Sequence, residues 1–510
     1  MRIGSGELGA EQFFQVISNR DTVEISSEAK EKVEKSYAFL KKFSQDKVIY
    51  GINTGFGSMA QFKIDDESRE ELQYNLIRSH SAGAGNFLPE LYLRSVVLAR
   101  LNTLLKGFSG IHTDAVELLA TLLSKNILPA IPEHGGVGAS GDLVQLAHLA
   151  LGLIGEGEVL FDGKIQETKG VFATNNITQL KVHVREGLAL MNGTSAMTGI
   201  GLINLKLARR AMHYSIVASA IINEIVQAYD DHFSFELNDT KRHNGQANVA
   251  AEMRKLLAGS KLVKHRPDHL YNKKVEVDVI KEKVQEYYSV RCVPQILGPV
   301  WDTLEYAERV LVNELNSVND NPVIDAEREN VYHGGNFHGD YVALEMDKMK
   351  IAVTKTCMLA ERQLNFLVND KLNNVLPPFV NLGKLGLNFG MQGIQFTATS
   401  TTAENQTLSN PMYVHSIPCN NDNQDIVSMG TNAALITKKV IDNTFDVLAI
   451  EMMAIAQAID FLKSDKKMSP LTRKVYDHIR SVSDKFVTDS PKYKEIKKLS
   501  DYLKENDLEL

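Results

Sequence analysis

Apolar residues recur at the spacing of an α-helix along most of the chain. Residues 93–105 carry apolar side chains at the i, i+3, i+4 spacing, which places them on one helical face. The same period returns over 116–123 and 143–154. Pro89 suits a first helical position, and Thr113 suits the N-cap of the second helix. The pattern therefore predicts a helix over each of these three stretches.

Three later segments are longer and are apolar on more than one face. They cover about 194–230, 340–370 and 427–463, and none of them contains a proline. A helix that is apolar around its circumference belongs in the interior of a helical assembly. These segments predict an all-α fold with a central bundle of long helices that is shared between subunits.

The N-terminal region has a more mixed pattern. Residues 22–26 alternate like a short strand, and 27–43 have the period of a helix. Residues 157–190 are short and alternating, which predicts a small hairpin excursion. The expected organisation is a small mixed N-terminal domain (1–190), the long-helix bundle (191–465) and a charged helical cap at the C-terminus (466–510).

Composition and charge narrow the class of partner. The chain has 510 residues, a net charge of −7 and no basic run, which argues against nucleic acid or an anionic membrane as partner. No window is apolar enough for a membrane span or a signal peptide. Cys292, Cys357 and Cys419 form no C-x-x-C pair, so neither a disulfide framework nor a zinc site is indicated. A cytoplasmic protein with a small soluble substrate is predicted.

A glycine-dense turn, Gly-Gly-Val-Gly-Ala-Ser-Gly-Asp at 135–142, precedes the apolar helix at 143. Glycine at this density indicates backbone angles or approaches that a Cβ would block. Most such turns are helix starts or phosphate cradles. Here the freedom has a further use, because the Gly141 nitrogen can attack the Ala139 carbonyl. Loss of two waters, one of them from Ser140, then leaves a five-membered ring with an exocyclic methylidene.

Further polar clusters lie in loops between the helices, where function concentrates on a rigid scaffold. A second glycine loop, 51–57, has Tyr50 at its mouth. The other clusters are Asn192-Gly193-Thr194, Gln285 with Tyr287 to Arg291, Asn319 to Pro322, Gly334 to His338, and Asn420 to Ser428. Together they predict a cavity rich in amides and tyrosines, with one arginine and no set of metal ligands.

Five of these motifs, in this order, resemble the histidine, phenylalanine and tyrosine ammonia-lyases over nearly the whole chain. They are Tyr50 to Gly57, Gly138-Ala139-Ser140-Gly141-Asp142, Leu190 to Thr194, Tyr288-Ser289-Val290-Arg291-Cys292, and Gly334 to His338. The resemblance implies an all-α fold of the ammonia-lyase and fumarase type. It also implies a homotetramer whose active sites take loops from more than one subunit.

The resemblance implies a cofactor made from the chain itself, with no metal and no pyridoxal phosphate. Ala139, Ser140 and Gly141 would cyclise without help into 4-methylidene-imidazol-5-one (MIO), the electrophile that the turn chemistry permits. Tyr50 would remove the β-proton, which requires a lowered phenol pKa. Arg291 would hold the substrate carboxylate.

The remaining site residues follow from the same resemblance. Those that would orient the electrophile and the substrate amine are Asn192, Tyr288 and Gln285. Phe337 would form a wall of the cavity, and Asn321 would also contact the substrate. Ser79, His80 and Gln424 would meet the substrate ring.

Two of these positions give opposite indications about the ring. Ser79-His80 is the pattern of the histidine enzymes, whereas Gln424 stands where those enzymes carry a glutamate. An imidazole gains from a carboxylate partner, and a phenol needs only a hydrogen-bond partner such as His80. The sequence therefore favours L-tyrosine, giving p-coumarate and ammonia, with L-phenylalanine as a poorer substrate.

Three alternatives stay open at this point. One is histidine ammonia-lyase, which forms urocanate. Another is an aminomutase, which uses the same ring but returns ammonia to the β-carbon. The third is an inactive helical assembly protein, against which stand Tyr50, Ser140, Asn192 and Arg291. An intact mass lower by two waters would favour an enzyme.

Overall fold

The computed structural model describes residues 1–45, 47–272, 274, 277–280 and 282–508. The chain forms two compact units, each made of several segments. Unit 1 consists of Met1–Asn204, Ala307–Asp347 and Pro411–Ile436, and unit 2 of Leu205–Tyr306, Lys348–Asn410 and Thr437–Leu510. The division into three consecutive domains, with boundaries at 190 and 465, stays a prediction.

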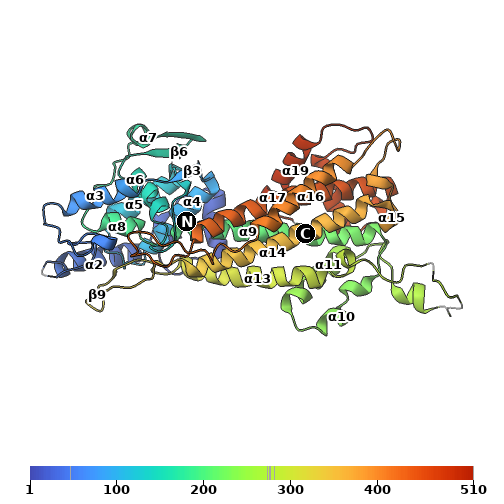
Figure 1. The fold of residues 1–510 in the computed structure, drawn as a ribbon, viewed down its shortest axis with the longest axis horizontal. Coiled ribbons are helices and arrows are strands. Elements are labelled where there is room, and N and C mark those ends of the chain that lie inside the picture. Colours follow the sequence, from blue (N-terminus) through green and yellow to red (C-terminus); the bar gives the residue numbers. More distant parts are fainter. Residues whose placement is uncertain (46, 273, 275–276, 281, 509–510) are drawn as a thin grey trace. The chain divides into compact units, whose positions relative to one another are not determined.

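The helices predicted near the N-terminus are present in unit 1 (Figure 1). Unit 1 holds α1 (Ala10–Asn19), α2 (Ser27–Phe43), α3 (Arg69–His80), α4 (Glu90–Leu104), α5 (Thr113–Ser124), α6 (Leu143–Leu153), α7 (Thr168–Thr174), α8 (Glu186–Met191) and the 3-10 turn η1 (Gly57–Met59). Two predicted helix starts differ by one residue. Pro89 is the N-cap of α4 rather than its first residue. His112, not Thr113, caps α5, because its ring nitrogen accepts a hydrogen bond from the Asp114 amide.

The strands of unit 1 are short and form small separate sheets. β1 (Arg2–Ile3) pairs in parallel with β2 (Glu24–Ile25), β3 (Ala84–Phe87) pairs antiparallel with β5 (Pro132–His134), and β8 (Val323–Asp325) pairs antiparallel with β9 (Asn330–Tyr332). β4 (Leu128–Pro129), β6 (Glu158–Phe161) and β7 (Lys164–Glu167) form an antiparallel three-stranded sheet. The hairpin predicted within 157–190 is β6 with β7, and the rest of that stretch contains α7 and the start of α8.

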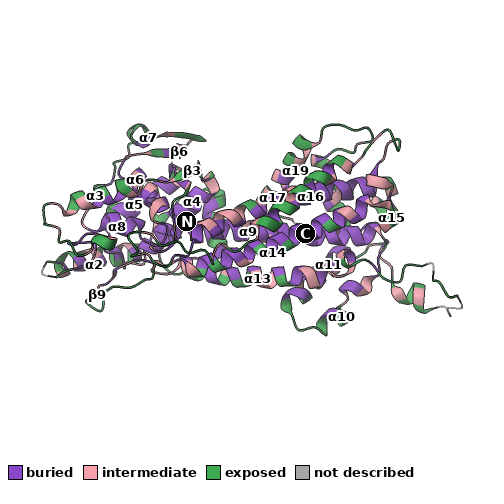
Figure 2. Cartoon of the chain, in the orientation of Figure 1, coloured by how far each residue is buried: buried purple, intermediate pink, exposed green. Residues whose placement is uncertain are grey.

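The three long helices predicted from the sequence are α9 (Ser195–Ile225), α14 (Asp340–Val368) and α17 (Gly430–Leu462). A further long helix, α13 (Val293–Leu315), was not predicted; it contains Pro299, although a proline normally interrupts a helix. Four of the five boundaries between the units fall within these helices, one in each, and the fifth lies between Asn410 and Pro411. Most residues of α17 are buried (Figure 2). Leu448, Met452 and Ile455 are among the fully buried ones, as expected of a helix that is apolar all round. The predicted all-α class is confirmed.

Shorter helices complete unit 2. They are η2 (Asp230–Phe233), α10 (Phe235–Asp239), α11 (Asn244–Leu257), the π-helical turn η3 (Pro267–Tyr271), α12 (Tyr288–Arg291), α15 (Asp370–Asn373), η4 (Pro378–Val380), α16 (Gln392–Leu408), η5 (Asp465–Lys467), α18 (Pro470–Val482) and α19 (Tyr493–Glu505). In the described part of the chain, no helix is both long and apolar enough to cross a membrane.

Candidate active site

A cavity of 500 Å³ in unit 1 brings together seven of the predicted site residues. They are Tyr50, Ser79, His80, Ser140, Gly141, Asn192 and Gln424. The first follows α2, the next two end α3, and the rest come from the glycine turn, the end of α8 and the loop before α17. Tyr50 and Gln424, 374 positions apart in sequence, therefore line one cavity.

The glycine turn is held against the loop that follows α8. Gly141 has a φ of +71°, and a Cβ on it would lie 2.0 Å from the Gly193 carbonyl oxygen. The Asp142 amide donates to the same oxygen at 2.8 Å. On the other side of the turn, Ala139 is buried against Val427 and Met429. No side chain fits at position 141, so the glycine is required for the close approach of the two loops.

Two side-chain amides contact Ser140. Asn192 Nδ2 donates to the Ser140 carbonyl oxygen at 3.2 Å, and Gln424 Nε2 donates to the Ser140 hydroxyl at 2.9 Å. Asn192 Oδ1 is buried and has no hydrogen-bond partner among the described residues. It is therefore a free acceptor beside Ser140, and buried polar atoms of this kind normally have a partner in the working protein.

Asp142 was part of the predicted motif but had no assigned role. It is fully buried, accepts a hydrogen bond from the Met197 amide at 2.8 Å and accepts another from the Thr431 hydroxyl. Burial raises the pKa of Asp142 to about 6. Its position directly after the turn was visible in the sequence. Its partners were not, because they come from the distant helices α9 and α17.

Tyr50 lies in the cavity wall with its hydroxyl accepting a hydrogen bond from the Gly57 amide at 2.9 Å. Burial raises the pKa of Tyr50, and the Gly57 hydrogen bond opposes this only in part. The expectation of a lowered pKa is thus not met by this chain alone. The reason is electrostatic, since the described residues that line the cavity include no lysine, arginine, aspartate or glutamate.

His80 lies at the C-terminal end of α3, and burial lowers its pKa, so the ring is neutral near pH 7. Its Nδ1 lies 3.0 Å from the Leu76 carbonyl oxygen, which can only accept. The proton of the neutral ring is therefore assigned to Nδ1, and Nε2 is left as an acceptor. The neighbouring Ser79 hydroxyl donates to the same carbonyl at 3.1 Å.

The loop that carries Gln424 contributes more than the sequence indicated. The Cys419 thiol donates to Gln424 Oε1 at 3.3 Å, and this fixes the amide so that its nitrogen is the atom facing Ser140. Cys419, Asn420 and Asn423 also line the cavity. Their side chains were not predicted as site residues, because only the loop as a whole was recognisable.

Three predicted residues lie elsewhere. Gln285, Tyr288 and Arg291 belong to unit 2, where they line a separate cavity of 790 Å³. Arg291 Nε donates to the Glu286 carbonyl at 3.0 Å, and its guanidinium lies 4.7 Å from the centre of the Tyr288 ring. Tyr288 is 71% exposed. The cation and the tyrosine predicted to bind substrate are thus held together, but they do not line the cavity of Ser140.

Asn321 and Phe337 are in unit 1 but do not line the Ser140 cavity. Asn321 Oδ1 accepts a hydrogen bond from the Gly334 amide at 2.9 Å, which joins its loop to the one that carries Phe337. Close to Phe337, the Gly339 amide donates to the Gly138 carbonyl at 3.0 Å. The loops of Asn321 and Phe337 are therefore hydrogen-bonded to each other, and the loop of Phe337 is also hydrogen-bonded to the glycine turn.

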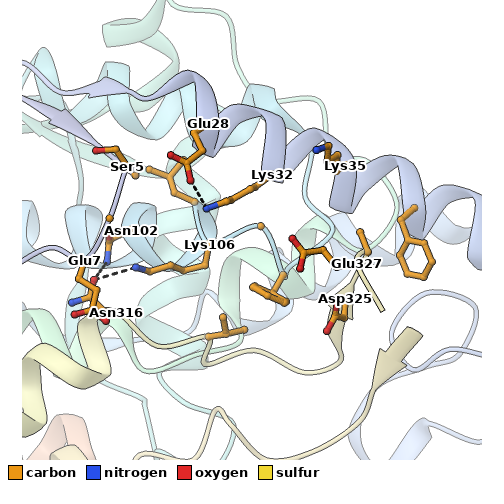
Figure 3. A pocket seen from close by; sticks show the side chains of 18 of the residues that line it. Ser5, Glu7, Glu28, Lys32, Lys35, Asn102, Lys106, Asn316, Asp325 and Glu327 are labelled. Carbon is orange, nitrogen blue, oxygen red and sulfur yellow. Dashed lines mark hydrogen bonds and ion pairs between the residues drawn. The ribbon is translucent and has the colours of Figure 1, made fainter. Parts of the chain in front are cut away.

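A larger cavity of unit 1 is a different one (Figure 3). It measures 820 Å³ and carries charges of both signs, among them Glu7, Glu28, Lys32, Lys35 and Lys106. Lys32 pairs with Glu28 at 2.8 Å, and Lys106 donates to Asn316 at 3.1 Å. None of the predicted site residues lines it. Size alone therefore does not identify the active site here.

Comparison with known proteins gives the family of the chain. Residues 8–481 match the family model of the aromatic amino acid lyases. The MIO-dependent tyrosine 2,3-aminomutase of Streptomyces globisporus is 41% identical over 481 residues, which are 93% of this chain and 89% of that protein. The histidine ammonia-lyase of Caldanaerobacter subterraneus subsp. tengcongensis is 38% identical over 508 residues, which are 99% of this chain and 97% of that protein.

The fold agrees as well. The crystal structure of a tyrosine aminomutase from Streptomyces globisporus superimposes with a TM-score of 0.95 at 38% sequence identity, covering 99% of this chain and 96% of that one. The similarity extends over both units and over every segment that lines the Ser140 cavity. The chain therefore belongs to the aromatic amino acid lyase family.

Proposed function

We propose that this protein eliminates ammonia from L-tyrosine to give p-coumarate. The observation that carries the proposal is the cavity in which Ser140, with an amide on its carbonyl and another on its hydroxyl, lies together with Tyr50 and His80. Membership of the aromatic amino acid lyase family supports the class of reaction. The choice of tyrosine rests on the polar groups of the cavity.

The family implies an MIO group, and the residues present fit it. Ala139, Ser140 and Gly141 form a turn in which position 141 has no space for a Cβ. Asn192 already hydrogen-bonds to the Ser140 carbonyl, which the ring retains, and would hold the ring in place, whereas Gln424 hydrogen-bonds to the hydroxyl that is lost as water. When formed, this group supplies an electrophilic carbon that no side chain of the protein offers. The proposal includes no metal and no pyridoxal phosphate in the reaction.

The chain's own residues then have separable tasks. The free Oδ1 of Asn192 is an acceptor for an N–H of the substrate's amino group, which would satisfy its buried lone pairs. Tyr50 faces the same cavity and would take the β-proton. A base with a raised pKa binds the abstracted proton strongly, but it must first lose its own. A positive charge brought close to the phenol would lower its pKa and so make the loss of its own proton easier.

The polar groups of the cavity favour a phenol as the substrate ring. Neutral His80 presents Nε2 as an acceptor, which matches the hydroxyl hydrogen of tyrosine. Gln424 is a neutral amide whose oxygen already accepts the Cys419 thiol, so it offers an imidazole no charged partner. L-Phenylalanine would leave the acceptor on His80 without a donor, and it is therefore expected to be a poorer substrate.

A substrate panel tests the proposal. Purified protein incubated with L-tyrosine should release p-coumarate, followed by its absorbance, together with an equal amount of ammonia. L-Histidine should give little urocanate. Urocanate as the main product would contradict the choice of tyrosine but not the class of reaction.

A second candidate is a tyrosine 2,3-aminomutase. It is favoured by the 41% identity to the Streptomyces globisporus enzyme, whose name describes that activity. Both candidates share the elimination step, and they differ in whether ammonia returns to the β-carbon. Chromatography of the same incubation for β-tyrosine separates them. β-Tyrosine accumulating ahead of p-coumarate would favour the aminomutase.

The charge at position 424 is expected to control the ring preference. In Gln424→Glu, a carboxylate would line the same cavity and could pair with an imidazole N–H of the substrate. We expect kcat/KM for L-histidine relative to L-tyrosine to rise by roughly 10- to 100-fold, since a charged hydrogen bond contributes about 1.5–3 kcal/mol. Asn423→Asp is the matched control, because it adds the same charge to the same cavity. An equal rise in both variants would contradict a specific role for position 424.

We further propose that the active protein is a homotetramer, in which Gln285, Tyr288 and Arg291 of another subunit complete the site. The Ser140 cavity has no cation among its described lining residues, yet an amino acid substrate carries a carboxylate. The Arg291 side chain lies in a separate cavity and is at least partly accessible. A guanidinium from a second copy would supply both the carboxylate partner and the positive charge that Tyr50 lacks.

Subunit complementation tests this arrangement. Ser140→Ala and Arg291→Met chains, each inactive alone, should regain activity when they are co-expressed, because some mixed sites receive both wild-type residues. Ser140→Ala with Asn192→Ala is the control, since both residues line one cavity of one chain and no mixed site can be intact. Equal recovery in both pairs, or in neither, would contradict a site shared between subunits.

A further inference from the structure

Two histidines and an aspartate form a cluster in unit 1 outside the Ser140 cavity. His112 caps α5, Asp114 lies in the first turn of that helix, and His183 precedes α8. One ligand atom of each residue lies within 4.8 Å of those of the other two. The two imidazole rings have their centres 4.9 Å apart. We propose that this cluster binds a divalent transition-metal ion of the zinc class.

The backbone under the cluster is held in place by one buried side chain. Glu186 accepts a hydrogen bond from the His112 amide at 2.8 Å through one carboxylate oxygen, and from the His183 amide at 2.6 Å through the other. The two histidines, 71 positions apart in sequence, are therefore clamped side by side. On the other side, the Tyr37 ring packs edge-on against His112 with their centres 5.0 Å apart. A metal site needs this kind of support to orient its ligands.

The ligand set fits a borderline cation. Two imidazoles and one carboxylate are the protein ligands of many zinc sites, with a water in the fourth position. His112 Nδ1 lies 3.3 Å from Asp114 Oδ2, close to the roughly 3.3–3.4 Å between neighbouring ligands of a tetrahedral ion bound at about 2.0–2.1 Å. Binding through this nitrogen would replace the capping hydrogen bond that it accepts from the Asp114 amide. Rotation of the partly exposed side chains would close the remaining separation.

The ring of His183 has no competing partner. Within the described residues, no hydrogen bond to either of its ring nitrogens is found, although its backbone amide is bound to Glu186. Lys181 adds a positive charge nearby, whereas Glu70 and Asp114 add negative charge. The surroundings therefore do not exclude a dication.

The position of the cluster defines what the ion would do. None of the three residues lines the Ser140 cavity, so the ion would take no part in the reaction. It would join the start of α5 to the segment that leads into α8. The last residue of α8 precedes Asn192, which hydrogen-bonds to Ser140. A bound ion is thus expected to stabilise the fold around the site rather than to change the chemistry.

Direct metal titration tests the proposal on the untagged full-length protein. After treatment with EDTA, the protein is titrated with ZnCl2 while the melting temperature is followed. A parallel titration with CoCl2 follows the visible d–d bands. We expect one ion per chain, a higher melting temperature with Zn²⁺, and Co²⁺ bands without a sulfur-to-cobalt band in the near ultraviolet. Binding of the ion to the folded state alone raises stability by mass action.

Two variants identify the ligands. Asp114→Asn and His183→Gln should each weaken Co²⁺ binding by at least about tenfold. His243→Gln, at an exposed histidine whose side chain makes no cap hydrogen bond, should bind as the wild type does. Asp114 is exposed, so its variant decides the question even if His183→Gln fails to fold. Absence of Co²⁺ bands in the wild type, binding undiminished in Asp114→Asn, or a thiolate band from the cysteines would overturn the proposal.

Discussion

Replacing Ser140 by alanine is expected to reduce kcat for L-tyrosine by at least about 10³-fold, because the variant keeps the turn but cannot form the methylidene carbon. Tyr50, His80 and Asn192 would remain around the cavity, so binding should suffer less than turnover. The measurements are p-coumarate release and the intact mass. The wild-type chain should be lighter by two waters than its sequence requires, and the loss should map to the peptide containing 139–141.

The control for this variant is Ser215→Ala. Ser215 is a fully buried serine on α9 in unit 2, and its hydroxyl has no partner among the described residues. Its removal should leave turnover and mass deficit unchanged. Turnover of Ser140→Ala within about tenfold of wild type would contradict the role of the serine. An unmodified wild-type mass in active protein would contradict the chain-derived electrophile itself.

Replacing Tyr50 by phenylalanine has the second-largest expected effect. The ring would keep its edge-on contact with Phe56, at 6.1 Å between ring centres, and only the hydroxyl that faces the cavity would be lost. We expect kcat to fall by about 10²- to 10⁴-fold, as for the loss of a general base, with a smaller change in KM. Steady-state kinetics with L-tyrosine measure both values.

Tyr74→Phe is the matched control for this change. The Tyr74 hydroxyl also accepts one backbone hydrogen bond, from the Val182 amide at 3.1 Å, and Tyr74 does not line the cavity. Both variants thus lose a phenolic oxygen and one hydrogen bond in unit 1. If Tyr74→Phe reduces kcat as much as Tyr50→Phe, the loss reflects the fold and not a catalytic base.

The pH dependence gives an independent measurement of the same role. Burial raises the pKa of Tyr50 above its ordinary value of 10.0. Below that pKa the fraction of phenolate grows about tenfold for each pH unit, so log kcat/KM should rise with pH from neutral into the alkaline range. The residual activity of Tyr50→Phe should lack this rise. A wild-type profile that is flat on the alkaline side of neutral would exclude the phenol as base.

Local properties of the chain were predictable from the sequence. The long helices α9, α14 and α17 followed from the apolar period, because a helix that must be buried on all faces carries apolar residues on all faces. The glycine turn was also predictable, since the backbone conformational freedom at Gly141 is a property of that residue and its neighbours. Helix α13 was not predicted, and it continues through Pro299. Surrounding packing outweighs one missing hydrogen bond there.

Only the tertiary structure decided which distant residues meet. It joined Tyr50, His80, Asn192 and Gln424 around Ser140, and it left Arg291 in another cavity. It also raised the pKa of Tyr50, opposite to the expectation, because burial and the absence of nearby charge are set by chain segments far away in sequence. For the same reason, no spacing in the sequence revealed that one carboxylate, Glu186, holds His112 beside His183. Periodicity and glycine freedom are local, whereas ligand distances and electrostatics exist only once the chain has folded.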